Sequence, residues 1–154
     1  MKKIKDIKAV YEECQTDGFI QFRKDVDRFL AESLLRSAKE ALVFLKQIEL
    51  VSEKMDDHSL LFTSTYDILR KLIEAFLLFD RLKCSNHQCA NAFLCTKHHG
   101  SYFDWGFLEE VRVYRNEVNY EGKRITSDIW RLSKSKFEFH INGLIGLIEK
   151  KIQA

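Results

Sequence analysis

The chain has 154 residues, which is enough for one hydrophobic core and too few for two domains of ordinary size. Lysine and arginine number 25 against 23 aspartates and glutamates, so the charge is mixed and the composition excludes a histone-like polycation. The sequence contains no proline and only six glycines, which favours long helices and disfavours a sheet protein with frequent turns.

The beginning of the chain and its apolar runs both indicate a protein that stays out of membranes. Residues 1–5 carry three lysines and lead into an amphipathic repeat, not into the continuous apolar core of a signal peptide. No apolar run approaches the roughly 18 residues that are needed to cross a bilayer. We therefore expect a cytoplasmic protein with no membrane partner.

Helical spacing of apolar residues organises the first half of the chain. The stripe over residues 4–14 predicts a first helix that ends at Gly18. A second helical pattern runs from 22 to about 52, with a break near residues 31–33 left open. After a polar connector, residues 61–79 are apolar over most of the helix circumference. This third helix should be the central and most buried one.

The second half of the chain continues the helical pattern. A capping-box spacing at 85–88 predicts a short helix that ends near Gly100. An apolar face over 107–118 predicts another helix, and a turn at 121–123 separates it from a last helix with an apolar stripe over 129–152. The patterns predict an all-α protein, a single up-and-down bundle of about five to six helices that forms one domain.

The central helix has one polar strip, whose members are spaced by three, four and seven residues and therefore share a face. The strip contains Asp67, Arg70, Lys71, Glu74 and Arg81. It is either a solvated stripe or the wall of a polar cleft.

Groups that bind phosphate or form hydrogen bonds are dense near the end of the predicted fifth helix. They are Arg112, Arg115, Asn116, Asn119 and Tyr120. Pairs four residues apart project to neighbouring places, and a guanidinium flanked by amides is suited to grip a phosphate. The alternative is structural: Arg115 pairs with a carboxylate such as Glu74, and the asparagines cap the helix end. We expect Arg115 and Asn116 beside Glu74 or His87 in one polar cleft.

Two blocks of the sequence carry a family resemblance. The first is Arg115-Asn116-Glu117-Val118-Asn119-Tyr120, and the second is the helix around 66–79 followed by Leu82-Lys83-Cys84-Ser85-Asn86-His87. The first is similar to the arginine motif of the HEPN superfamily, where Arg is followed after four residues by His, and some prokaryotic groups have Asn-Tyr at its end. The second resembles the central helix and following turn of those groups. The resemblance covers roughly residues 30–150 and leaves 1–29 as an N-terminal helical extension.

This resemblance implies a HEPN-like bundle with a metal-independent endoribonuclease site that needs no cofactor, usually assembled across a dimer. The His acts as base for attack by the 2′-hydroxyl, and the Arg stabilises charge. In this chain Tyr120 stands at the His position, and a phenol with an ordinary pKa of about 10 is a poor base at neutral pH. By this resemblance the catalytic candidates are Arg115, Asn119 and Tyr120, and the binding candidates are Arg112, Asn116, Glu74, Lys83, Asn86 and His87.

Two functions of different classes are compatible with these residues. The first is a HEPN protein of the toxin–antitoxin or defence type, which binds and cleaves RNA beside a small nucleotidyltransferase partner. The second is a non-catalytic helical module that binds a nucleotide or another protein, which the Tyr120 substitution favours. The neighbouring aromatics Tyr102, Phe103 and Trp105 cannot all face one core, so at least one should point outward and mark a homodimer interface.

The segment 84–99 concentrates cysteine and histidine, which are ligands of zinc. It has no Cys-x-x-Cys pair, and Cys89 and Cys95 would lie on nearly opposite sides of a helix, so we expect no metal. Because the chain has a full-sized core and no export signal, we expect all four cysteines, Cys14 included, to be reduced thiols.

Overall fold

The computed structural model describes residues 3–99 and 102–154, and helices make up most of them. In chain order these are α1 (Ile7–Thr16), α2 (Arg28–Ser52), α3 (Ser59–Leu77), a 3-10 turn (Leu78–Asp80), α4 (His87–Lys97), α5 (Trp105–Glu121) and α6 (Ser127–Gln153). Two short strands, β1 (Gln21–Phe22) and β2 (Leu82–Lys83), form the sheet found in this part of the chain. The all-α class predicted from the sequence is confirmed.

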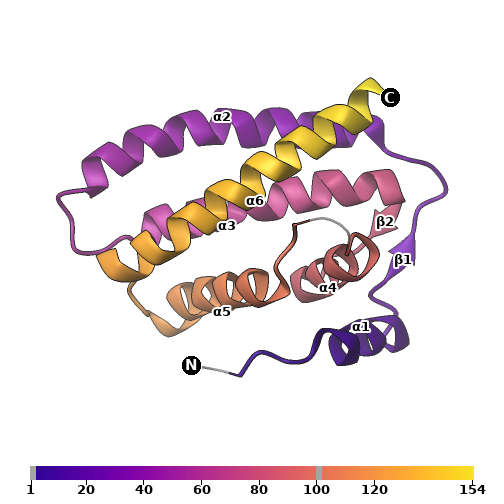
Figure 1. Ribbon diagram of the computed structural model, residues 1–154, viewed down its shortest axis with the longest axis horizontal. Coiled ribbons are helices and arrows are strands. Elements are labelled where there is room, and N and C mark those ends of the chain that lie inside the picture. Colours follow the sequence, from indigo (N-terminus) through magenta and orange to yellow (C-terminus); the bar gives the residue numbers. More distant parts are fainter. Residues whose placement is uncertain (1–2, 100–101) are drawn as a thin grey trace.

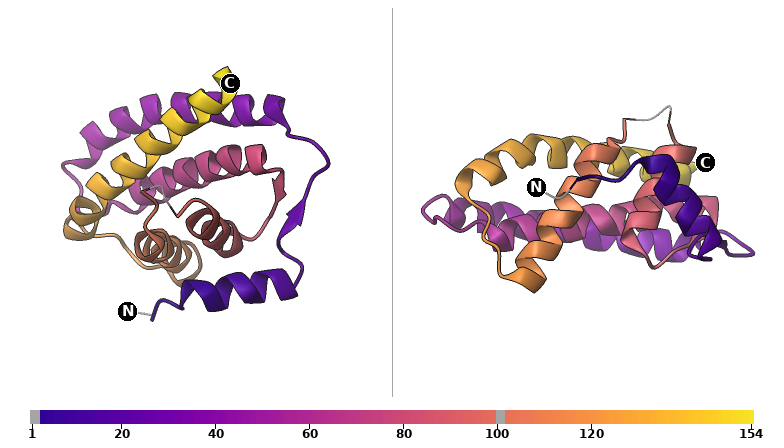
Figure 2. Two further views of the ribbon diagram at one scale, coloured as in Figure 1. Left: turned by 45° about the vertical axis from the view of Figure 1, so that its right-hand side comes forward. Right: turned by 90° about the horizontal axis from the view of Figure 1, so that it is seen from below.

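The helices are arranged around α3. Figure 1 shows α2 along one side of α3, α4 and α5 along the other side, and α6 crossing it obliquely. Contacts of α3 with each of these four helices agree with that view. Helix α1 lies outside α4, as the turned view of Figure 2 also shows. Three helices that contribute to the candidate site, α3, α4 and α5, are therefore mutual neighbours.

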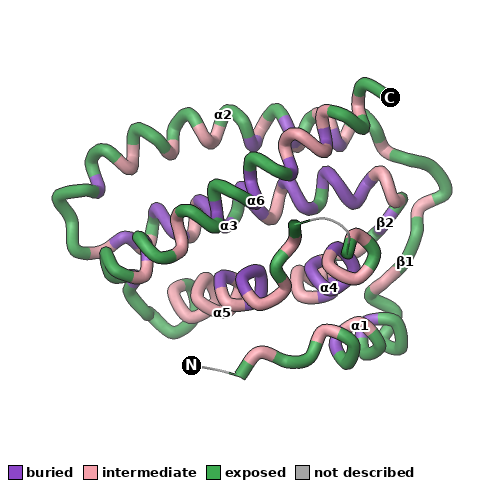
Figure 3. The backbone as a smooth tube through the Cα atoms, viewed as in Figure 1, coloured by how far each residue is buried: buried purple, intermediate pink, exposed green. Residues whose placement is uncertain are grey.

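The central helix is the most buried one, as its apolar circumference predicted. More than half of the residues of α3 are buried, and Figure 3 shows its burial in contrast to the exposed outer side of α2. Phe62 is fully buried, and its ring meets those of Phe137 and Tyr114 edge to face at 5.3 and 6.0 Å. These contacts connect α3 with α5 and α6 in the main core, while a second, smaller cluster of buried residues lies between α1 and α4.

Side-chain caps set where the helices begin. Asp27 accepts a hydrogen bond from the backbone N–H of Leu30, so α2 begins at Arg28 and continues without a break to Ser52. The predicted start of this helix at Phe22 is wrong, because Phe22 pairs with Leu82 in the antiparallel β1–β2 ladder. The ladder connects the N-terminal segment to the turn before α4.

The short helix α4 differs from its prediction by one residue at its start. Asn86 caps it by accepting from the N–H of Cys89, so the capping-box assignment to Ser85 is wrong by one residue. The helix ends at Lys97, and the predicted end near Gly100 falls outside the described residues. The predicted turn after α5 is confirmed, since Gly122 ends that helix with a φ of 68°.

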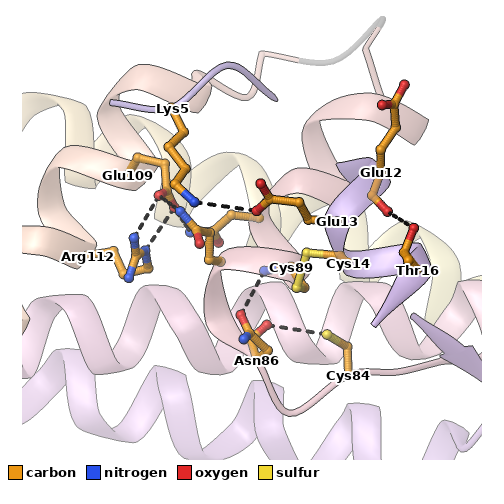
Figure 4. Close-up of a disulfide and its surroundings, with 12 residues drawn as sticks. Lys5, Glu12, Glu13, Cys14, Thr16, Cys84, Asn86, Cys89, Glu109 and Arg112 are labelled. Atoms are coloured by element: carbon orange, nitrogen blue, oxygen red, sulfur yellow. Dashed lines mark hydrogen bonds and ion pairs between the residues drawn. A yellow bond between two sulfur atoms is a disulfide. The ribbon is translucent and has the colours of Figure 1, made fainter. Parts of the chain in front are cut away.

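A disulfide overturns the expectation that all cysteines are reduced. Cys14 of α1 and Cys89 of α4 are joined, although 75 residues separate them (Figure 4). Cys84 and Cys95 are free. Their Cα atoms are 5.7 Å apart because α1 packs directly on α4. The expectation of reduced thiols rested on the size of the core, whereas the disulfide depends on which helix α1 packs against. Among the described residues no helix is long and apolar enough to span a membrane.

Candidate functional site

Seven polar or aromatic side chains from three helices form one group, which we call the polar cluster. It consists of Tyr66, Asp67 and Arg70 from α3, His87 from α4, and Arg112, Arg115 and Asn116 from α5. The three helices contact one another, so residues far apart in sequence meet at this place.

Arg115 is the least satisfied cation of the polar cluster. Its side chain is 20% exposed, and its Nη2 atom lies 3.8 Å from Oδ1 of Asp67, which is itself 52% exposed. Nη1 donates a long hydrogen bond of 3.5 Å to Oδ1 of Asn116, and the guanidinium lies 5.8 Å from the centre of the Tyr66 ring. Its buried Nε has no hydrogen-bond partner among the described residues. These long contacts leave most of the guanidinium's donors available to an acceptor.

Arg70 and His87 form the second part of the polar cluster. Nη1 of Arg70 lies 3.1 Å from Nε2 of His87, and because a guanidinium can only donate, Nε2 must be the unprotonated acceptor. The proton then sits on Nδ1, which lies 3.4 Å from the hydroxyl of Tyr66. Burial lowers the pKa of His87 below its ordinary 6.5, and the charges of Arg70, Arg115 and Arg112 lower it further. The imidazole is therefore neutral at pH 7.

Arg112 differs from its two neighbours because a carboxylate holds it. Glu109 is 2% exposed and accepts from Nε and Nη2 of Arg112 at 3.0 and 2.9 Å (Figure 4). The same carboxylate accepts from Gln88 at 2.7 Å and from Asn91 at 3.4 Å. This network connects α4 with α5 and satisfies the buried charge. Arg112 thus contributes positive potential to the polar cluster, but its Nε and Nη2 atoms already donate to Glu109.

Burial also changes the ionisation of Tyr66. It raises the pKa of this phenol to about 12, although the nearby arginines act in the opposite direction. Tyr66 therefore remains protonated at neutral pH, and its hydroxyl can accept the proton of the His87 Nδ1. Its ring covers one side of the Arg115 guanidinium.

The remaining predicted site residues lie outside the polar cluster. Glu74 is exposed and lines a pocket together with Arg70 and His87, while the ion-pair partner of Arg115 is Asp67. Asn86 caps α4. Lys83 is exposed on β2 opposite Gln21.

Asn119 and Tyr120 are both exposed in the last turn of α5. Helix α5 is continuous here, so five residues rotate Tyr120 by about 140° away from Arg115, whereas four rotate Asn119 by only about 40°. The phenol of Tyr120 is 78% exposed. Within one chain, Asn119 projects on the same side of α5 as Arg115, and Tyr120 does not.

Three residues of the site were absent from the set of candidates: Tyr66, Asp67 and Arg70. Asp67 and Arg70 belonged to the polar strip of the central helix, so the spacing had already placed them on a shared face with Glu74. Tyr66 gave no such signal, because an aromatic residue in a helix that is apolar over most of its circumference is expected in the core. Glu109, which holds Arg112, also gave none, because a glutamate on a helix is usually solvated.

The described residues contain no group of three or more histidine, cysteine, aspartate or glutamate side chains arranged to hold a metal ion. Cys89, one of the thiols considered as a zinc ligand, is bonded to Cys14 in this structure. No protein-family model, curated protein or solved structure matches the chain. What the polar cluster can do is therefore argued from its own geometry.

Proposed function

We propose that the polar cluster binds the phosphate backbone of RNA, as in a HEPN-type protein. The observation that carries the proposal is the pair of poorly satisfied guanidinium groups, Arg70 and Arg115, on two different helices. Each has a buried Nε without a hydrogen-bond partner among the described residues. A phosphate would accept from the Nη atoms of these side chains, because arginine binds phosphate through parallel hydrogen bonds.

The charge balance of the polar cluster also favours an anion. Three guanidinium groups converge there, and two carboxylates, Asp67 and Glu109, are the acidic partners that ion-pair with them in the described structure. Glu109 already forms an ion pair with Arg112, and the distant, half-exposed Asp67 offsets little of the Arg115 charge. The neutral imidazole of His87 adds no negative charge. One formal positive charge is therefore left over within the polar cluster, a count that leaves out Glu74 of the neighbouring pocket.

A binding measurement tests this proposal. We expect labelled single-stranded RNA to bind the protein in fluorescence anisotropy, and Arg115→Ala to weaken the affinity roughly tenfold or more, because hydrogen bonds to charged groups contribute about 1.5–3 kcal/mol. Arg131→Ala is the matched control, since Arg131 is 78% exposed on α6 and pairs with Asp128. Equal affinity of Arg115→Ala and the unchanged protein, with both folded, would overturn the proposal.

Metal-independent cleavage of RNA is a second candidate function, which the neutral state of His87 favours. The HEPN resemblance puts Tyr120 in the place of the base, yet that phenol points away from Arg115. His87 is the imidazole beside both guanidinium groups, and its Nε2 becomes available to accept the proton of a 2′-hydroxyl once a bound phosphate draws Arg70 away from it. Cleavage in EDTA that leaves cyclic phosphate ends, and that is lost in His87→Asn, would support an enzyme. Binding without cleavage would support the non-catalytic module.

The proposed partners are those that the resemblance implies. They are a second copy of the chain and a small nucleotidyltransferase. Tyr102 is 78% exposed and meets the 54% exposed Phe139 edge to face at 5.9 Å, as the prediction of an outward aromatic required. Phe103 packs on Phe76, and Trp105 donates from Nε1 to the carbonyl of Lys5. Tyr102 and Phe139 are therefore the aromatic surface that we assign to the homodimer.

A further inference from the structure

A pocket of about 230 Å³ lies directly beside the polar cluster. It is bounded by α3, the β2 strand and the beginning of α4, and it shares Arg70 and His87 with the polar cluster. A group bound in the pocket would therefore be in contact with the proposed phosphate-binding residues. If the phosphate backbone of RNA contacts Arg70 and Arg115, an adjacent part of the same nucleotide chain lies at the opening of this pocket.

The lining of the pocket combines buried apolar side chains with polar ones. Ile73, Leu77 and Leu82 line it and are at most 5% exposed. The polar lining comes from Arg70, Glu74, His87 and Ser85, among others. A lining of apolar side chains with a few polar groups suits a planar heterocycle, which buries its faces and forms hydrogen bonds at its rim. At about 230 Å³ the pocket is smaller than the usual sites for drug-sized molecules, so it suits one ring system.

Glu74 is the acidic group of this pocket. Its carboxylate forms no ion pair within the described part of the chain, even though Arg70 is one helical turn away. The side chain is exposed, so it is hydrated and ready to accept hydrogen bonds from a ligand. A carboxylate has two acceptor oxygens side by side and therefore binds best to two adjacent donors.

We infer that this pocket receives a guanine base, with Glu74 accepting from its Watson–Crick edge. The inference rests on the RNA-binding function proposed above and assigns its base preference. Among the four RNA bases, guanine alone presents two adjacent donors, N1–H and N2–H. Adenine and cytosine each place an acceptor next to their amino donor, and uracil places its single N–H between two carbonyls, so these edges oppose a carboxylate. Unpaired bases of RNA are commonly bound in this way, on their Watson–Crick edges.

Two short RNAs distinguish this inference from general RNA binding. One contains uridine only, and the other has a single central guanosine in the same uridine sequence. We expect the protein to bind the guanosine RNA about tenfold more tightly, as expected for one good bidentate contact. In Glu74→Gln the two affinities become equal, while binding of the uridine RNA is unchanged. Glu40→Gln, which changes an exposed glutamate of α2, keeps the tenfold preference.

Each other outcome has a defined meaning. Equal binding of the two RNAs by the unchanged protein, or a preference that survives in Glu74→Gln, overturns the guanine inference and leaves RNA binding intact. If neither RNA binds, the proposed function fails, and the pocket is then tested with free guanosine and adenosine. Amide shifts at Ile73, Leu77 and Leu82 with guanosine only, and lost in Glu74→Gln, would support a nucleobase site without RNA. Absence of those shifts would overturn the site as well.

Discussion

Arg70 donates a hydrogen bond from Nη1 to Nε2 of His87 across 3.1 Å. A permanently charged donor at this distance disfavours protonation of Nε2, so the contact, together with burial, lowers the pKa of the imidazole. The same contact brings a residue of α3 to the first residue of α4. The ionisation of the site and the packing of two helices are therefore coupled through one hydrogen bond.

The pKa of His87 should respond directly to its neighbour. We expect an NMR titration of the ring protons to show a midpoint below 6.5 in the unchanged protein. Arg70→Ala removes one repelling charge and should raise that midpoint, whereas Arg131→Ala should leave it unchanged. A midpoint at or above 6.5 in the unchanged protein would contradict the neutral state of His87.

The lowered pKa of His87 also has a consequence for stability. The unfolded chain binds this proton with the ordinary pKa of 6.5, and the folded chain binds it more weakly. The stabilising contribution is therefore complete above pH 6.5 and is lost as the pH falls through 6.5 towards the folded pKa. His140 shifts in the same direction, so urea unfolding is compared between the unchanged protein and His87→Asn. The loss of stability between pH 7 and 5 should be smaller in His87→Asn, and equal losses would contradict the prediction.

The Cys14–Cys89 bond should account for a large share of the attachment of α1. Because the bond closes a loop over a separation of 75 residues, Cys14→Ser should lower the free energy of unfolding by about 2–4 kcal/mol. Dithiothreitol should destabilise the unchanged protein similarly and have no effect on the stability of Cys14→Ser. A thiol assay of the denatured, unreduced chain should detect two free thiols, Cys84 and Cys95. Four free thiols would contradict the disulfide.

The buried carboxylate of Glu109 should be coupled energetically to Arg112. Glu109→Ala leaves Arg112, which is 20% exposed, without its ion-pair partner and also leaves Gln88 and Asn91 without their acceptor. We expect a loss of about 3 kcal/mol in chemical unfolding. The double variant with Arg112→Ala should lose less than the sum of the two single variants. Additive losses would show that Glu109 and Arg112 are not coupled energetically.

Assembly is tested by light scattering. We expect twice the 18.2 kDa chain mass at micromolar concentration. Tyr102→Ser combined with Phe139→Ser should reduce the mass to that of one chain, because both rings belong to the assigned interface. Phe44→Ser is the control, since Phe44 is a 73% exposed aromatic on α2. A monomer of the unchanged protein would remove the dimer from the proposal.

Local rules were enough to derive the helices from the sequence. The lack of proline, the apolar circumference of residues 61–79 and the glycine at 122 are local signals, and they predicted the helical class, the burial of α3 and the end of α5 without knowledge of the fold. The start of α2 was missed, because Phe22 pairs with Leu82 in a strand. The predicted N-cap of α4 was wrong by one residue. Ser85 and Asn86 can both cap a helix, and only the backbone conformation selects Asn86.

The partners of the site residues were decided by tertiary structure. Glu74 and Asp67 share the polar strip of α3 two helical turns apart, and spacing alone could not show which one α5 approaches. The position along α3 at which α5 packs brings Arg115 to Asp67, and Glu74 instead lines the neighbouring pocket. The bond between Cys14 and Cys89 has the same origin, since it depends on α1 covering α4. Pairings of this kind arise from packing between elements far apart in the chain, and no periodicity within one element encodes them.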